Sequence, residues 1–110
     1  MTAGRFTLHI EQGATLDQTF KITNPPDNLT DHDARMHVRR LYESETADLI
    51  LTKANGGIIL SEEEVRIYAA PSVTASLSHD GVYDIELITP SDEVIRFLEG
   101  SVLLSPEVTR

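Results

Sequence analysis

The chain has 110 residues, enough for one domain with a single modest hydrophobic core. It carries 18 acidic against 9 basic residues, and this net charge of −9 argues against nucleic acids and anionic membranes as partners. No cysteine is present, so disulfides and thiolate zinc sites are excluded. No apolar run approaches the roughly 20 residues of a membrane-spanning helix, and residues 1–13 lack the pattern of a signal peptide.

Alternating apolar and polar residues predict strands throughout the first half of the chain. The first strand covers residues 6–10, and a second covers residues 15–23 with an interruption at its centre. Prolines and asparagines then predict a loop over residues 24–28. A third strand begins at Ala34 and is expected to run as far as Tyr42.

Short strands and turn signals continue through the second half. The glycines of the turn Asn55-Gly56-Gly57 both tolerate positive φ, and Gly100 is expected to mark a bulge or a crossing point. Residues 71–77 favour one helical turn, and residues 105–110 an exposed tail. The strands are predicted over residues 48–53, 58–60, 65–69, 82–89 and 94–104.

Seven to nine short strands without a long helix predict an all-β fold. We expect a single antiparallel β-sandwich, immunoglobulin-like or related, and a small barrel is the alternative. No internal repeat or linker divides the sequence, so residues 1–110 are expected to form one domain.

Three polar clusters contain residue types that occur in catalytic or metal sites. Asp31-His32-Asp33, with His37 nearby, has metal-binding residue types, but it suits a loop before a strand. Ser78-His79-Asp80 contains the residues of a catalytic triad, yet adjacent residues cannot converge as a triad requires. The run 62–64 of three glutamates is typical of a solvated face. We therefore expect no catalytic residue, no metal and no cofactor.

Basic residues concentrate in one place along the chain. Arg35 and Arg39 share strand parity, so both are expected on one polar face, and Arg40 follows as a near neighbour. Arginine is favoured at protein interfaces because it forms bidentate pairs with carboxylates. The alternative is pairing within the molecule with its many acidic residues. The three arginines are the first candidates for a protein interface.

A scattered pattern of turn and core residues extends over residues 6–110. Its segments are GVYDIELITP at 81–90, VIRFLEGSV at 94–102, SPEVTR at 105–110, Gly13, FKIT at 20–23, LT at 29–30, ARMHVR at 34–39 and NGGI at 55–58. Together these segments resemble small proteins of tailed bacteriophages. They are similar to the β-sandwich tail accessory domains of baseplates and tail fibres, with some likeness to the amino-terminal domains of baseplate upper proteins. The chain departs from the family pattern at Ser91-Asp92-Glu93, where relatives carry an Asp-Gly type hairpin.

The resemblance implies a virion structural protein, made in the host cytoplasm, without catalysis. It implies an adaptor in the baseplate, tail or tail-fibre attachment region, present in multiple copies in a symmetric assembly with other virion proteins. A capsid decoration or cement protein, a host-surface binding module and a small hydrolase are the alternatives.

The carboxyl-terminal tail is a second candidate interface. Pro106, Val108 and Arg110 are the residues expected to contact a partner, because an exposed tail can add a strand to a neighbour's sheet edge. Assembly that is unchanged after deletion of residues 105–110 would exclude this role.

Overall fold

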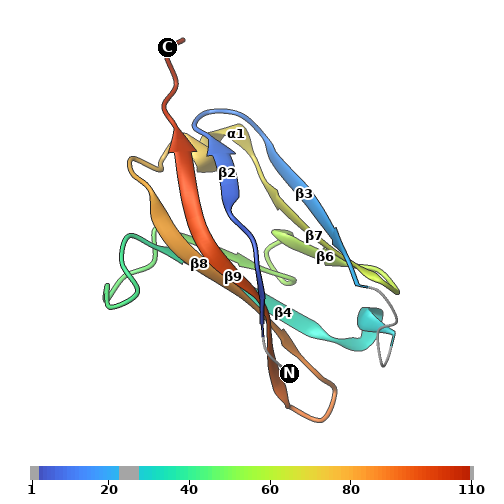
Figure 1. Ribbon diagram of the computed structural model, residues 1–110. Coiled ribbons are helices and arrows are strands. Elements are labelled where there is room, and N and C mark those ends of the chain that lie inside the picture. Colours follow the sequence, from blue (N-terminus) through green and yellow to red (C-terminus); the bar gives the residue numbers. More distant parts are fainter. Residues whose placement is uncertain (1–2, 23–27, 110) are drawn as a thin grey trace.

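Two β-sheets pack face to face around one hydrophobic core (Figure 1). The computed structural model describes residues 3–22 and 28–109. Within them the elements are β1 (Gly4–Arg5), β2 (Leu8–Glu11), β3 (Leu16–Lys21), the 3-10 helix η1 (Leu29–Asp31), β4 (Asp33–Arg39), β5 (Leu49–Thr52), β6 (Ile58–Leu60), β7 (Glu64–Ala69), α1 (Pro71–Thr74), β8 (Gly81–Ile88) and β9 (Val94–Ser105). The predicted β-sandwich is confirmed.

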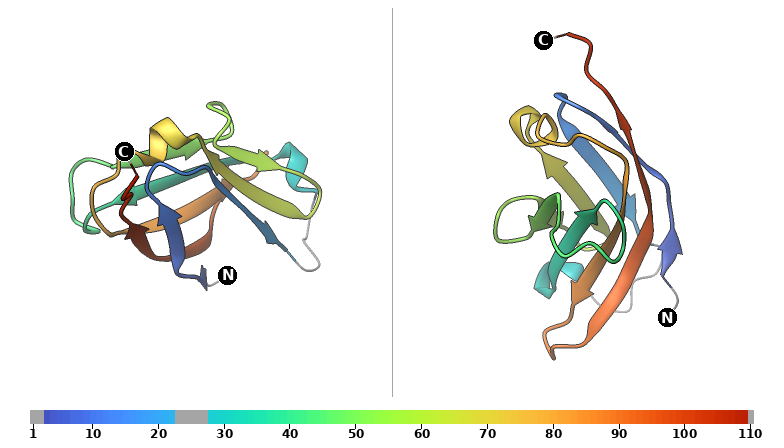
Figure 2. Two further views of the ribbon diagram at one scale, coloured as in Figure 1. Left: turned by 90° about the horizontal axis from the view of Figure 1, so that it is seen from above. Right: turned by 90° about the vertical axis from the view of Figure 1, so that its left-hand side faces the viewer.

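The larger sheet has the strand order β1-β9-β8-β4-β5, and β2 also pairs with β9 (Figure 2). The smaller sheet has the order β3-β7-β6. Both β1 and β2 run parallel to β9, whereas the other pairings are antiparallel. The sandwich is thus mainly antiparallel, as the sequence predicted, with these two parallel pairings at one edge of the larger sheet. Almost the whole chain separates β2 from β9, so no hairpin imposes an antiparallel direction.

The core forms because strands from both sheets present alternate apolar side chains inward. In the larger sheet, Met36 of β4 lies opposite Ile85 of β8, and both are fully buried. Val65 and Ile67 of β7 face them from the smaller sheet. Burial of each such side chain contributes about 1.5–3 kcal/mol relative to exposure.

The amino-terminal segment crosses close above Gly100 of β9. The amide of Phe6 donates to the Glu99 carbonyl at 3.0 Å, and the Phe6 carbonyl accepts from the Tyr83 hydroxyl at 2.8 Å. A β-carbon on Gly100 would collide with that same carbonyl oxygen. The crossing predicted at Gly100 is confirmed. The strand predicted over residues 6–10 begins only at Leu8, as β2, because Phe6 lies at the crossing, and β1 precedes it at Gly4–Arg5. The register shift of the β8–β9 pair lies elsewhere, between Ile85 and Glu86.

The helical turn predicted over residues 71–77 is confirmed as α1, which Pro71 begins. Its Thr74 is fully buried and joins α1 to the turn between β2 and β3. The Thr74 hydroxyl donates to the Ala14 carbonyl at 2.7 Å and accepts from the Gly13 amide at 3.1 Å. Gly13 has a φ of +82°, which lets the chain pass from the larger to the smaller sheet.

Within the described residues, no helix has the length and apolar character needed to cross a membrane.

Three local predictions need correction or refinement. Strand β4 ends at Arg39 rather than Tyr42, because a loop follows in which Ser44 donates its amide to the Leu41 carbonyl at 3.0 Å. Only Gly56, and not Gly57, has a positive φ in the turn before β6. The loop between β8 and β9 turns at Asp92, which has a φ of 66°. Aspartate adopts positive φ more readily than most residues. The loop at residues 24–28 lies, apart from Asn28, outside the described residues.

Substitution of Gly100 by alanine tests the crossing. We expect Gly100→Ala to lower the free energy of unfolding by about 1–3 kcal/mol, because the added methyl group displaces the Phe6 carbonyl and strains the close packing there. Urea denaturation measures the change. Ser101→Ala, at the exposed neighbouring position, is the control and should stay within about 0.5 kcal/mol of the wild type. Equal stability of the two variants would show that the crossing tolerates a side chain.

The buried hydroxyl of Tyr83 makes stability sensitive to alkaline pH. Burial raises the pKa of Tyr83 to about 12. Below pH 10 the phenol is protonated in both the folded and the unfolded chain, so its contribution to stability is complete. Between pH 10 and 12 only the unfolded chain ionises, so stability falls by about 1.4 kcal/mol per pH unit from this group.

Tyr83→Phe removes this titration, so we expect its unfolding free energy to fall less steeply from pH 10 to 12. The variant starts lower by about 1 kcal/mol, because the hydrogen bond to Phe6 is lost. Urea denaturation across pH 8–12 gives both quantities. Tyr42→Phe is the matched control, since Tyr42 is 86% exposed and should leave the curve unchanged. Parallel curves for the wild type and Tyr83→Phe would contradict the prediction.

Candidate functional site

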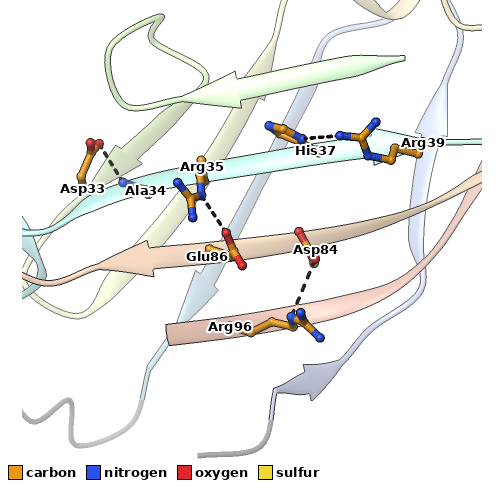
Figure 3. A network of polar contacts seen from close by, with 8 residues as sticks. All are labelled: Asp33, Ala34, Arg35, His37, Arg39, Asp84, Glu86 and Arg96. Carbon is orange, nitrogen blue, oxygen red and sulfur yellow. Dashed lines mark hydrogen bonds and ion pairs between the residues drawn. The ribbon is translucent and has the colours of Figure 1, made fainter. Parts of the chain in front are cut away.

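Charged side chains gather on the outer face of the larger sheet, across β4, β8 and β9 (Figure 3). Successive side chains of a strand point to opposite faces of the sheet. The apolar residues of these strands therefore point into the core, and the charged residues point outward. We call this surface the arginine face, and its residues are Arg5, Arg35, His37, Arg39, Asp84, Glu86 and Arg96.

Arg35 is held by an acidic residue of the next strand. It lies directly opposite Glu86 in the β4–β8 register, and its Nε donates to Glu86 Oε1 at 2.7 Å. Both side chains retain contact with solvent, so the pair contributes at most about 1 kcal/mol. This pairing within the molecule is the alternative that the sequence left open for Arg35. At the start of the same strand, Asp33 accepts a hydrogen bond from the Ala34 amide at 2.8 Å.

Arg39 is held within β4 and by the loop after it. Its Nη2 contacts Nδ1 of His37 at 3.2 Å, and its Nη1 donates to the Ser44 carbonyl at 3.1 Å. Because a guanidinium only donates, the His37 ring nitrogen is the acceptor. These contacts fix the direction of the guanidinium without placing a carboxylate against it. Arg39 therefore offers a preorganised cation to a partner.

Asp84 lies at the centre of the arginine face. Its Oδ2 is 3.7 Å from Nε of Arg96, on the neighbouring strand β9. Burial raises the pKa of Asp84 and the neighbouring Glu86 carboxylate adds to the effect, whereas the guanidinium of Arg96 opposes it. The ionised carboxylate is thus incompletely compensated by its own molecule. It is available to accept a hydrogen bond from a partner.

A hollow of about 380 Å³ opens between these side chains. Arg5, Arg39 and Arg96 line it together with Asp84, and Tyr42 stands beside it with 86% of its surface exposed. Tyrosine and arginine are the residues most enriched where interfaces concentrate their binding energy. The arrangement suits recognition of carboxylate and hydroxyl groups on a protein surface.

The interface residues predicted from the sequence are only partly brought together. Arg35 and Arg39 lie on one face of β4, as their parity predicted. Arg40 is exposed after the end of that strand and does not line the hollow. Pro106 and Val108 are exposed in the tail beyond β9, remote in the chain from these arginines. Arg110 lies outside the described residues.

The histidines of the supposed metal cluster lie on opposite sides of the sheet. His32 is buried, whereas His37 faces outward beside Arg39. Among residues 3–22 and 28–109, no group of three potential ligands is placed to hold a metal ion.

The other two polar clusters lie in or next to loops. In the loop before β8, His79 Nε2 lies 3.7 Å from Asp48, and Asp80 accepts from the Leu104 amide at 2.8 Å. His79 thus connects this loop to the segment before β5, and Asp80 connects it to β9. The three glutamates at 62–64 are exposed.

Sequence reasoning missed four of the seven residues of the arginine face, namely Arg5, Asp84, Glu86 and Arg96. Alternation along β8 puts Asp84 and Glu86 on the face opposite its buried residues, but it does not show which cations they meet. Arg5 and Arg96 come from strands far apart in the sequence, which converge on this face only through pairing with β9 and β8. Alternation within one strand carries no signal for that convergence.

The sequence matches no protein-family model and no curated protein. Among solved structures, it is similar to the extracellular domains of the voltage-gated sodium channel beta4 subunit, whose parallel homodimers explain its role in cell–cell adhesion. The TM-score is 0.54 at 12% sequence identity, over 98% of this chain and 97% of the other. This likeness shows the fold, which is an immunoglobulin-like β-sandwich.

Proposed function

We propose that the chain is a non-catalytic protein-interaction domain and a structural component of a tailed-phage virion, where it acts as an adaptor in the baseplate, tail or tail-fibre attachment region. The virion role rests on the sequence resemblance, and the interaction role rests on the arginine face. The fold is compatible with both roles, because a small β-sandwich is a rigid support for a binding surface.

The distribution of arginines is the observation that carries the interaction role. Four of the seven arginines lie on one face of the larger sheet, in a chain with a net charge of −9. Arg66, by contrast, lies on the smaller sheet in a bidentate pair with Asp17 at 2.7 and 2.8 Å. Among residues 3–22 and 28–109, no carboxylate is paired with Arg39 in this way. A partner surface with acidic and hydroxyl side chains would complete its hydrogen bonding.

The position in the virion is tested by separating purified virions of the parent phage into heads and tails. We expect the protein in the tail fraction, in a fixed ratio to the tail-tube protein that reports the symmetry of the assembly. Mass spectrometry of each fraction measures this. Enrichment with heads would instead support the capsid decoration role, and absence from both fractions would contradict any virion role.

The arginine face is tested by Arg39→Ala. We expect at least about a tenfold loss of incorporation into particles, because truncating a central interface arginine commonly costs 2 kcal/mol or more. Quantitative mass spectrometry of particles from complemented infections measures it. Arg66→Ala is the matched control on the other sheet, and thermal denaturation must show that both variants fold. Equal incorporation of the two variants would exclude Arg39 from the interface.

A further inference from the structure

His37 holds Arg39 through a hydrogen bond that only a neutral imidazole can accept. Both residues are half-buried on the outer face of β4, and Arg39 Nη2 lies 3.2 Å from His37 Nδ1 (Figure 3). A guanidinium carries donors only, so Nδ1 presents its lone pair and the ring proton lies on Nε2. A second proton on the ring would occupy Nδ1 and end this hydrogen bond. It would also bring two positive charges side by side.

Charged groups surround His37 from several strands of the larger sheet. In the β4–β5 register the residue opposite His37 is the apolar Ile50, and in the β4–β8 register it is Asp84. The titratable and charged side chains around the ring, which share its two surface hollows, are Arg35 and Arg39 of β4, Asp84 and Glu86 of β8, Arg96 and Glu99 of β9, Arg5 of β1, and Tyr42 of the loop after β4.

Asp84 is the anion best placed to receive a protonated His37. The β-carbons of opposite residues in an antiparallel pair are about 4.5–5.5 Å apart, a distance that rotation of the imidazole can span. Glu86 is already held by Arg35 at 2.7 Å, and Glu99 lies one strand further away, on β9. The contact of Asp84 with Arg96 is longer, at 3.7 Å, and leaves its carboxylate open to a closer donor.

We propose that His37 is a pH-dependent switch on the arginine face. The neutral ring accepts from Arg39 and fixes the guanidinium, whereas the protonated ring leaves Arg39 and donates to Asp84. Histidine is the side chain whose charge commonly changes between about pH 5 and 8. Acidification therefore leaves Arg39 with its bond to the Ser44 carbonyl and engages the carboxylate that a partner would use. Weaker partner binding at acidic pH follows. This consequence rests on the proposed function, but the exchange itself takes place in the free chain.

The exchange is tested by NMR on the free, isotope-labelled full chain from pH 8 down to pH 5. At pH 8 the ring nitrogen shifts of His37 should identify the Nε2–H tautomer, and nuclear Overhauser effects should connect the ring to the Arg39 side chain. On acidification these effects should be lost and replaced by effects to Asp84. The Nε–H signal of Arg39 should move with the same midpoint as the ring signals of His37.

His37→Gln keeps an acceptor oxygen that does not titrate in this range, so the Arg39 signal should become independent of pH. His9→Gln, at an exposed position on β2, is the matched control and should leave the titration of Arg39 unchanged. An Nδ1–H tautomer at pH 8, or an Arg39 signal that stays still while His37 titrates, would overturn the switch. These wild-type measurements decide the question even if His37→Gln does not fold, and they need no partner.

The consequence for binding is tested on purified particles held at pH 8 and at pH 5.5. At pH 5.5 we expect the released fraction of the wild-type protein to exceed that of His37→Gln by about two- to tenfold, as loss of one hydrogen bond to the partner would give. His9→Gln should be released like the wild type. Equal release of wild type and His37→Gln would overturn the regulation of binding. Absence of the protein from particles would instead contradict the virion role, and the NMR titration would still decide the switch.

Discussion

The contact between the amino-terminal segment and β9 above Gly100 positions side chains on both faces of the larger sheet. Absence of a side chain at Gly100 lets the Phe6 carbonyl approach the strand and accept the Tyr83 hydroxyl. Arg5 then lines the outer hollow, and Phe6, the next residue, packs edge to face against Phe20 of the smaller sheet. One backbone approach thus delivers a cation to one face and an aromatic ring to the other.

The larger sheet separates two kinds of chemistry through simple alternation. Along β4, Met36 packs in the core, whereas Arg35 and His37 face outward. The same register that places Met36 opposite Ile85 places Arg35 opposite Glu86. Core packing and the outer ion pairs therefore depend on one strand alignment, and a slip by one residue would disrupt both. This coupling explains how a small domain holds a charged face in a defined geometry.

Much of the fold could be predicted from the sequence because alternation and turn residues act locally. Most strands, the helical turn α1 and the crossing at Gly100 follow from such signals, whereas the 3-10 helix η1 was not predicted. The parallel pairing of β1 and β2 with β9 could not be predicted, since it joins the two ends of the chain. The convergence of Arg5 and Arg96 depends on that pairing. The burial of His32 was also hidden, because the charged residues Asp31 and Asp33 on either side predict an exposed loop.

The arginine face and the core beneath it respond differently to salt. The arginine face keeps its charges partly solvated, so partner binding there should weaken as salt screens the interaction. The core is packed through apolar contacts, which salt affects little. Alternation keeps the two apart along β4, so Arg39→Ala changes the charged face without contacting the buried Met36. A loss of partner binding at high salt, in a protein that stays folded, therefore identifies the arginine face as the surface that binds.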